Sequence, residues 1–189
     1  MFSPKVKRVI DAVDRLRDEV DDHYQIPRDE AALLAQIVKA GRCVSICEIG
    51  TSYGFSTLHL AAATREHGGH VHSLDRNPKK FAAATRHLTD AGLVDSVSLY
   101  QGDALELLKS ISPPTPFDFA FIDADKSQSF DYLDLLIPKL APSYVIVTDN
   151  TTTHAEELAG FVARLRELPG VTSCHVPVGN GFELTVRRA

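Results

Sequence analysis

The chain has 189 residues, of which 44% are hydrophobic and 24% are charged, and this mixture is typical of a globular protein. Its net charge of −5 and its pI near 5.9 argue against a general nucleic-acid binder, which would carry a basic face. No apolar stretch is long enough for a transmembrane helix, and the first residues lack the apolar core of a signal peptide.

Two helices are expected in the N-terminal part of the chain. Apolar residues recur at helical spacing between Val6 and Val20, with charged residues between them, and Pro27 ends that region. A second helix should run from about Asp29 to Ala40, and Gly41 should close it.

From residue 43 onward, strand and helix patterns alternate regularly. The expected strands are 43–49, 71–74, 97–100, 117–122 and 144–148. The expected helices are 54–66, one that starts at Asn77-Pro78, 104–109, 130–136, and one that starts with a capping box at Thr153 and ends at Leu168. Strands that alternate with helices in this way predict a parallel sheet with helices on both faces.

The end of the chain departs from this alternation. Strands are expected at 171–178 and 182–187, and Gly179-Asn180-Gly181 between them is a hairpin signal, so the last strand should be antiparallel. The pattern as a whole predicts a doubly wound α/β fold. We expect one domain, 1–189, with N-terminal helices at 1–41 and a core sheet at 42–189.

The segment after the first strand of the sheet has the features of a ligand-binding loop. Gly50 and Gly54 let the chain turn tightly and let a ligand approach the backbone. Ser52 stands where a dinucleotide fingerprint would carry a glycine for contact with a pyrophosphate. A ligand with an adenosine but no phosphate therefore suits the loop better, although a plain strand-to-helix turn would also explain the glycines.

Acidic residues follow the next two strands. Asp75, 25 residues after Gly50, could accept hydrogen bonds from both ribose hydroxyls, or it could start a solvated loop. Asp103 could hold an adenine amino group, or it could cap the following short helix. The glycine loop and Asp75, in this order on consecutive strands, are more specific than either feature alone.

Oxygen donors also end the fourth and fifth strands of the sheet. If the two strands are parallel neighbours, Asp123, Asp149 and Asn150 converge above the sheet edge, where they suit Mg²⁺, Mn²⁺ or Ca²⁺. They could instead cap loops, with Lys126 as their counter-ion. Beside a cation and partly buried, Lys126 would favour its neutral form and could accept a proton, unless it is a surface lysine paired with Asp125.

These motifs resemble the cation-dependent O-methyltransferases, the group that contains catechol O-methyltransferase and caffeoyl-CoA O-methyltransferase. The resemblance covers about residues 26–189, and its most specific part is the Asp-Ala-Asp-Lys block with the later Asp-Asn pair. The matching segments are 48–51 with 54–56, Asp75 with 77–78, 102–104, 117–126, 147–150 and 177–181. The resemblance implies a Rossmann-like sheet of seven strands, with the last antiparallel, and S-adenosylmethionine as the cofactor.

The resemblance also implies roles for individual residues. Cofactor-binding positions fall on Glu48, Gly50, Thr51, Ser56, Asp75, Ala104, Asp125 and Tyr132, and Asp103 is a further candidate because it ends the third strand. Metal ligands fall on Asp123, Asp149 and Asn150, with Mg²⁺ as the first choice. Lys126 falls on the general base, and the implied acceptor is a small, catechol-like hydroxyl compound.

Three departures from the family leave the acceptor open. The N-terminal region, which often helps to form the substrate site and dimer, is short; Ser129 replaces a common aromatic residue, and Ser143-Tyr144 replaces a common Gly-Gly turn. The loop after Asn150, which often gates the substrate, is also short. His23, Tyr24 and His154 are candidate substrate-site residues, although His154 could simply lie in the first turn of a helix.

Three other functions remain open at this point: a metal-independent methyltransferase on another oxygen or nitrogen nucleophile, a nicotinamide-dependent oxidoreductase, and a catalytically idle binding or scaffolding protein. The missing middle glycine argues against the oxidoreductase. Three cysteines without paired metal spacing indicate reduced thiols in a cytoplasmic protein. We expect a small-molecule partner, no nucleic acid and no membrane. The amphipathic first helix could either pack on the sheet or build a homodimer, and composition does not decide between the two.

Overall fold

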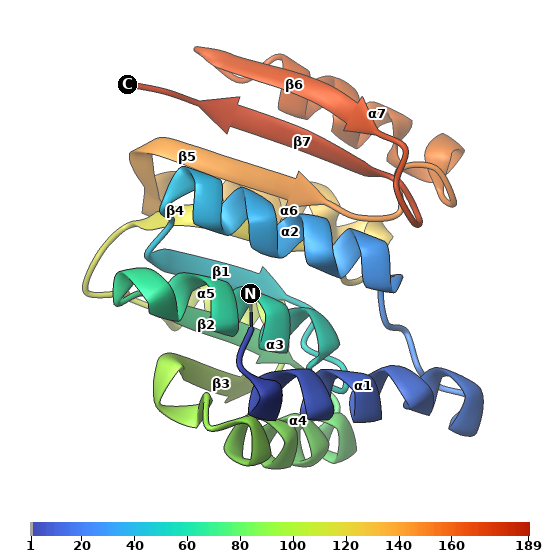
Figure 1. Cartoon of the computed structure of the whole chain (residues 1–189). Coiled ribbons are helices and arrows are strands. Elements are labelled where there is room, and N and C mark those ends of the chain that lie inside the picture. Colours follow the sequence, from blue (N-terminus) through green and yellow to red (C-terminus); the bar gives the residue numbers. More distant parts are fainter. Residues whose placement is uncertain (1) are drawn as a thin grey trace.

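A seven-stranded sheet lies at the centre of the computed structural model, which describes residues 2–189 (Figure 1). The strands are β1 (Ser45–Ile49), β2 (His70–Asp75), β3 (Val97–Gln101), β4 (Phe117–Ile122), β5 (Leu140–Thr148), β6 (Val171–Val176) and β7 (Phe182–Arg187). Their order across the sheet is β3-β2-β1-β4-β5-β7-β6. The first five strands pair in parallel, and β7 pairs antiparallel with both β5 and β6, so the predicted fold class is confirmed.

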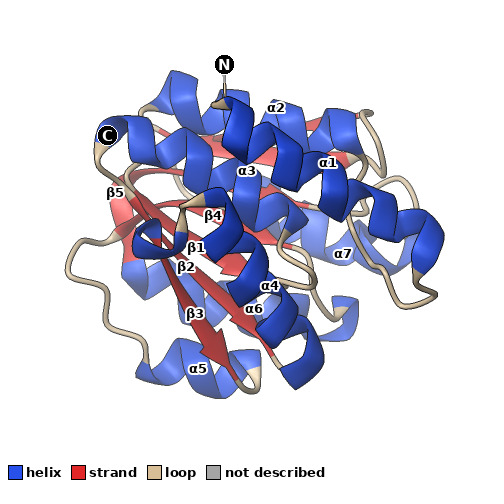
Figure 2. Ribbon diagram, turned by 60° about the horizontal axis from the view of Figure 1, so that its bottom comes forward, coloured by secondary structure: helices blue, strands red, loops and turns tan. Residues whose placement is uncertain are grey.

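Seven α-helices cover both faces of the sheet in the part of the chain described, as Figure 2 shows. They are α1 (Pro4–Glu19), α2 (Arg28–Gly41), α3 (Phe55–Thr64), α4 (Pro78–Ala91), α5 (Ala104–Ser110), α6 (Ser129–Leu136) and α7 (Ala155–Arg166). The helices α1 to α4 supply apolar side chains to one core cluster and α5 to α7 to the other. The first helix therefore packs within the fold, as one reading of its amphipathic pattern predicted.

The strand β4 shows why the sheet is buried on both faces. Its side chains alternate between the two cores, because successive residues of a strand point to opposite faces. Phe119 and Phe121 enter the cluster with α1 to α4, whereas Ala120 and Ile122 enter the cluster with α5 to α7. Apart from Asp118, every residue of β4 is apolar, so its next polar side chains come at the carboxyl end of the strand.

Several predicted boundaries differ from the structure by two residues or more, and the starts of β5 and α7 are two of them. The strand β5 begins at Leu140, so Ser143-Tyr144 lies inside a strand and not in a turn. The helix α7 begins at Ala155, and its N-cap residue His154 makes no side-chain capping bond, so the predicted capping box at Thr153 is absent. The reason is that the backbone N–H groups of residues 151–153 donate to carbonyls of the β6–β7 turn.

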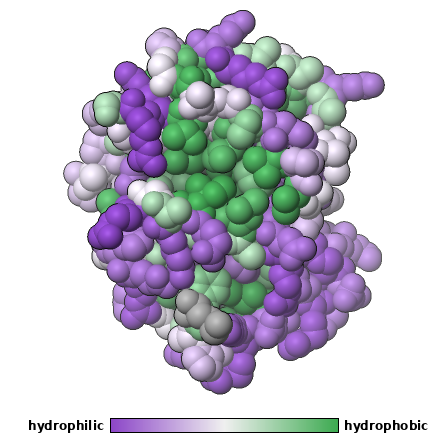
Figure 3. Space-filling view, turned by 45° about the horizontal axis from the view of Figure 1, so that its top comes forward, coloured by the Kyte–Doolittle hydropathy of each residue, from purple (hydrophilic) through white to green (hydrophobic). Residues whose placement is uncertain are grey.

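Hydrophobic residues gather on one exposed face of the molecule, where Figure 3 shows a hydrophobic area bordered by hydrophilic residues. Partly buried apolar side chains at the edge of the core on α2 and β7 include Leu33, Ile37, Leu184 and Val186. Within residues 2–189, no helix combines the length and apolar character needed to cross a bilayer.

Candidate active site

A cavity of about 680 Å³ opens at the carboxyl ends of the parallel strands. This is the edge where open α/β sheets bind ligands, and the volume is in the range of small-molecule sites. The predicted site residues that line it are Gly50, Asp75, Asp103, Ala104, Asp123, Asp125, Lys126, Tyr132, Asp149 and Asn150. The candidate substrate residues His23, Tyr24 and His154 line it as well.

The glycine loop is in close contact with the end of β4. Gly50 has φ +108°, and a Cβ atom at this position would overlap the carbonyl oxygen of Asp123. The backbone of Asp123 cannot move aside for such an atom, whereas the end of a flexible side chain could. Gly50 therefore lets the loop after β1 and the predicted cation site after β4 share one edge of the cavity.

Replacing Gly50 with alanine should destabilise the protein by about 3 kcal/mol, because the new methyl group adds a backbone clash to an unfavourable φ. Urea unfolding measures the loss. Gly68 is the matched control, because it also has a positive φ (+74°) but no atom within 4 Å of the place a Cβ would take, so only the backbone penalty of about 1 kcal/mol applies. Equal losses in Gly50→Ala and Gly68→Ala would contradict the close approach.

Asp75 organises the loop with both of its carboxylate oxygens. Oδ2 accepts a hydrogen bond from the backbone N–H of Ser52 at 2.6 Å, and Oδ1 accepts one from Asn77 at 2.8 Å. Asn77 in turn caps α4 by accepting from the N–H groups of Lys79 and Lys80. Each oxygen of Asp75 keeps a lone pair for a further donor, such as a ribose hydroxyl.

Asp103 and Asp125 both cap turns at the rim of the cavity. Asp103 accepts from the N–H groups of two residues in the first turn of α5, so its predicted capping role is confirmed. Asp125 accepts from the backbone and the hydroxyl of Ser127, at 3.1 and 2.7 Å, and these bonds hold its pKa below the usual range. The hydroxyl of Tyr132 donates to Gln128 at 2.6 Å. Contacts of these residues with a cofactor stay predictions.

The structure places Glu48, Thr51 and Ser56 behind the glycine loop, outside the residues that line the cavity. Glu48 is fully buried in β1, where its carboxylate accepts hydrogen bonds from Ser56, Thr57 and Ser73 at 2.5–2.6 Å. The hydroxyl of Thr51 lies 2.6 Å from that of Ser73. These groups tie the loop to β1, β2 and α3, and through the loop they shape the cavity.

Stability should depend on pH through Glu48. Burial raises its pKa from 4.5 to about 7, although three hydroxyl hydrogen bonds lower it. The folded state then holds the proton more tightly than the unfolded state, so this contribution to stability is full below pH 4.5 and is lost as the pH rises to about 7. Glu48→Gln should therefore remove about 3 kcal/mol of the stability difference between pH 4.5 and pH 8.

Urea unfolding of Glu48→Gln and wild type at the two pH values tests this expectation. The exposed Glu19 on α1 provides the control, because Glu19→Gln should leave the difference unchanged. If Glu48→Gln showed the same pH dependence as the wild type, another group would carry it.

Two carboxylates and a lysine meet where β4 and β5 end. Ile122 and Thr148 are paired in the sheet, so the next residues, Asp123 and Asp149, emerge side by side. Lys126 Nζ lies 3.1 Å from Asp123 Oδ1, so the pairing of this lysine with Asp125 is wrong. Burial raises the pKa of Asp123, the Lys126 ammonium lowers it, and the Asp149 carboxylate raises it, with a net shift upward.

These residues fit a hard divalent cation. Asp149 Oδ1 is buried and has no hydrogen-bond partner among the residues described, so it is available to bind a cation. Asn150 lines the cavity beside it, in a left-handed conformation with φ 67°, and its Nδ2 donates to Thr153. Within residues 2–189, no three His, Cys, Asp or Glu side chains are already gathered for a metal, and the predicted set combines two carboxylates with an amide oxygen.

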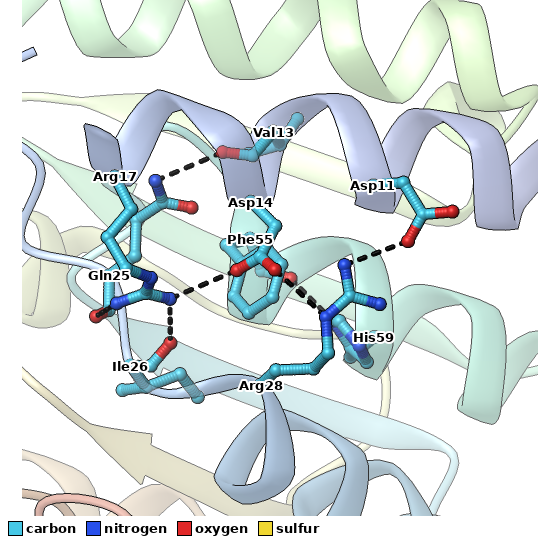
Figure 4. Close-up of polar contacts among 9 residues, drawn as sticks. All are labelled: Asp11, Val13, Asp14, Arg17, Gln25, Ile26, Arg28, Phe55 and His59. Carbon is cyan, nitrogen blue, oxygen red and sulfur yellow. Dashed lines mark hydrogen bonds and ion pairs between the residues drawn. The ribbon is translucent and has the colours of Figure 1, made fainter. Parts of the chain in front are cut away.

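The N-terminal region closes one side of the cavity, and Figure 4 shows how it is anchored. Arg17 on α1 donates to the carbonyls of Gln25 and Ile26 at 3.0 and 2.9 Å, and Gln25 donates to the carbonyl of Val13 at 3.2 Å. Arg28 forms ion pairs with two acidic residues of α1, Asp11 and Asp14. The short N-terminal region therefore still forms a wall of the site.

Three residues of the site were missed by sequence reasoning. Lys80 donates to the carbonyl of Asp22 at 2.7 Å and lies over the Tyr24 ring at 4.6 Å, which ties α4 to the N-terminal wall. Asn180, from the hairpin motif, lies 3.4 Å from Asp149 through Nδ2. Glu30 of α2 is fully buried, and burial together with the Asp149 carboxyl holds its pKa well above the usual range.

Comparison with known proteins gives the family. The chain matches the O-methyltransferase family over residues 11–188. A catechol O-methyltransferase from Niastella koreensis is 35% identical over 128 residues, which cover 67% of this chain and 56% of the relative. One from Mycobacterium tuberculosis is 39% identical over 118 residues, covering 62% and 51%. The chain thus spans about half the length of these two relatives.

Solved structures of other proteins resemble this chain over nearly its whole length. Cofactor-bound Rv0187 from MTB is 28% identical, with a TM-score of 0.84 over 98% of this chain and 90% of that one. The O-methyltransferase from Bacillus cereus in complex with SAH, at 24% identity and a TM-score of 0.85, covers 98% of this chain and 91% of its own and shares the fold. With the family match over nearly its whole length, the chain belongs to the O-methyltransferase family that its motifs indicated.

Proposed function

We propose that this protein transfers a methyl group from S-adenosylmethionine to a hydroxyl of a small, catechol-like acceptor, with the help of a divalent cation. The observation that carries the proposal is the meeting of Asp123, Asp149 and Asn150 at the end of a cavity whose other strand ends present Asp75 and Asp103. The catechol O-methyltransferases among the relatives and the SAH complex of a neighbour support it.

The cofactor end of the cavity is formed by strands β1 to β3. Asp75 would accept hydrogen bonds from ribose hydroxyls, while the rim residues Asp103, Asp125 and Tyr132 would surround the adenine. The glycine loop lets the ligand approach the backbone at Gly50. A cofactor bound in this way would direct its methyl group toward the ends of β4 and β5, where the acceptor would bind.

At the acceptor end, Asp123, Asp149 and Asn150 would hold the cation. A divalent cation supplies Lewis acidity that makes an acceptor hydroxyl easier to deprotonate. Lys126, oriented by its 3.1 Å contact with Asp123, would accept the hydroxyl proton at Nζ. For this role Lys126 would have to enter the reaction as the neutral amine. Holding the oxygen, methyl carbon and sulfur in line supplies much of the remaining acceleration.

The decisive experiment is methyl transfer from S-adenosylmethionine to a panel of small catechols, with Mg²⁺ and again with EDTA. Turnover that EDTA removes is expected. Turnover that survives EDTA would favour a metal-independent methyltransferase, and cofactor binding without turnover would favour an idle binding protein. An absorbance change with reduced nicotinamide would point to the oxidoreductase.

Two other expectations stay predictions. The hydrophobic area of Figure 3 would be a suitable face for a homodimer, since contiguous apolar surface of this kind often lies in interfaces. The cytoplasmic location and the absence of nucleic-acid partners rest on composition alone.

A further inference from the structure

Glu30 is unusual because an acidic residue in the first turn of a helix would ordinarily face solvent. It is the third residue of α2, and its exposed fraction is 0%. The neighbouring Asp29, also in the first turn, is exposed. Burying a carboxyl group costs free energy unless partners compensate for its lost hydration, so the surroundings of Glu30 should contain the reason for its position.

The β6–β7 turn holds one oxygen of Glu30. The backbone N–H of Asn180 donates to Glu30 Oε2 at 3.0 Å. A Cβ atom on Gly179 would overlap the same oxygen, which shows how tightly the turn packs against the side chain. Asn180 also lies 3.4 Å from Asp149 Oδ2 through its amide nitrogen. The turn therefore fixes Glu30 and Asp149 relative to each other.

The other oxygen of Glu30 has no partner, although Asp149 of the proposed cation site lies nearby, on the other side of Asn180. The carboxyl groups of Glu30 and Asp149 both contact Asn180, and burial together with the Asp149 carboxyl raises the pKa of Glu30. Glu30 Oε1 and Asp149 Oδ1 are both buried, and neither has a hydrogen-bond partner among the residues described. Anchoring the turn needs only Oε2, so it does not account for a second, unpartnered oxygen beside another carboxylate.

We propose that Glu30 is a further protein ligand of the divalent cation, through Oε1, alongside Asp123, Asp149 and Asn150. The inference rests on the proposed function, because it needs the cation at that site. A third carboxylate raises the negative charge around the ion, and in calcium sites the number of charged ligands tunes affinity. The three carboxyl groups are not gathered around one point in the described structure, so Oε1 has to rotate toward the ion on binding.

Such a ligand set has a consequence for the acceptor. Mg²⁺ demands near-octahedral coordination. With four protein ligands, such an ion keeps a pair of positions for the acceptor, which two neighbouring oxygens of a catechol-like compound would fill. Glu30 then defines the acceptor as a bidentate one, because the protein supplies the remaining ligands.

Binding of Mn²⁺, followed by the EPR signal of the free ion without cofactor or acceptor, tests the proposal independently of turnover. Glu30→Gln keeps the size of the side chain and an acceptor for Asn180, and it should weaken Mn²⁺ binding about tenfold or more. Asp29→Asn, one position earlier in the chain, should bind Mn²⁺ as the wild type does. Thermal unfolding in EDTA checks that each variant is folded.

The outcomes separate the two proposals. Unchanged Mn²⁺ affinity in Glu30→Gln, with weakened binding in Asp149→Asn, would overturn the role of Glu30 and leave the cation site standing. A wild-type protein that binds no Mn²⁺ would overturn both. If Glu30→Gln does not fold, Glu30→Asp, which keeps the charge on a shorter side chain, should still bind more weakly than the wild type, and wild-type affinity in it would contradict ligation.

Discussion

Replacing Asp149 with alanine should lower cation-stimulated methyl transfer by about 100-fold, equivalent to ~3 kcal/mol of transition-state stabilisation, and change the affinity for S-adenosylmethionine little. The reason is that Asp149 lies away from the expected contacts with the cofactor. Asp149 follows β5, beside Asp123, whereas the expected cofactor contacts lie at Asp75 and Asp103, beyond β1. Its Oδ1 is buried and has no hydrogen-bond partner among the residues described, so it is available to bind the cation.

Two measurements check this expectation: turnover at saturating cofactor, and calorimetric titration with S-adenosylhomocysteine. Asp149→Asn is the isosteric companion, since it keeps the buried volume and loses the charge. The exposed Asp95→Asn should match the wild type in both measurements. Full turnover in a folded Asp149→Ala variant would remove the cation from the mechanism.

The order of strands and helices could be predicted because the period of the apolar pattern changes along the chain. Apolar runs such as the one that became β4 are typical of strands in a parallel sheet with helices on both faces. The glycines around Asn180 likewise predicted the β6–β7 hairpin. Local sequence was sufficient in both cases, because the signal and the structure span the same few residues.

The start of β5 could not be predicted in this way. Pro142 and Ser143 are poor strand formers, and proline gives no N–H to a sheet. In the structure the pairing of β4 with β5 shifts register between Phe117 and Phe119, and this irregularity accommodates the proline-containing segment. The extension therefore depends on how two distant segments pair.

The residues of the candidate site likewise include some that the local sequence predicts and some that it does not. The acids that end strands could be predicted, since parallel topology brings their positions to one edge. Glu30 and Lys80 could not, because one looks like an ordinary acid in the first turn of a helix and the other like a surface lysine. Their burial comes from packing between α2, α4 and the loops, which no local pattern encodes.

Replacing Asp75 with asparagine should weaken the binding of S-adenosylhomocysteine by about 10- to 100-fold, the range expected for losing one or two hydrogen bonds to a charged acceptor. The asparagine side chain would keep one oxygen for the N–H of Ser52 or Asn77, but its amide nitrogen would repel the other N–H. Part of the loss would therefore come from the glycine loop. Calorimetric titration measures the total.

A second ligand separates the two parts. If Asp75 accepts hydrogen bonds from the ribose, the wild type should bind S-adenosylhomocysteine more tightly than its 2′-deoxy analogue, and Asp75→Asn should lose most of that preference. The cycle of two proteins and two ligands isolates the interaction between the carboxylate and the hydroxyl, because loop distortion weakens both ligands alike. Equal preferences in the two proteins would mean that Asp75 acts only by bracing the loop between Ser52 and Asn77.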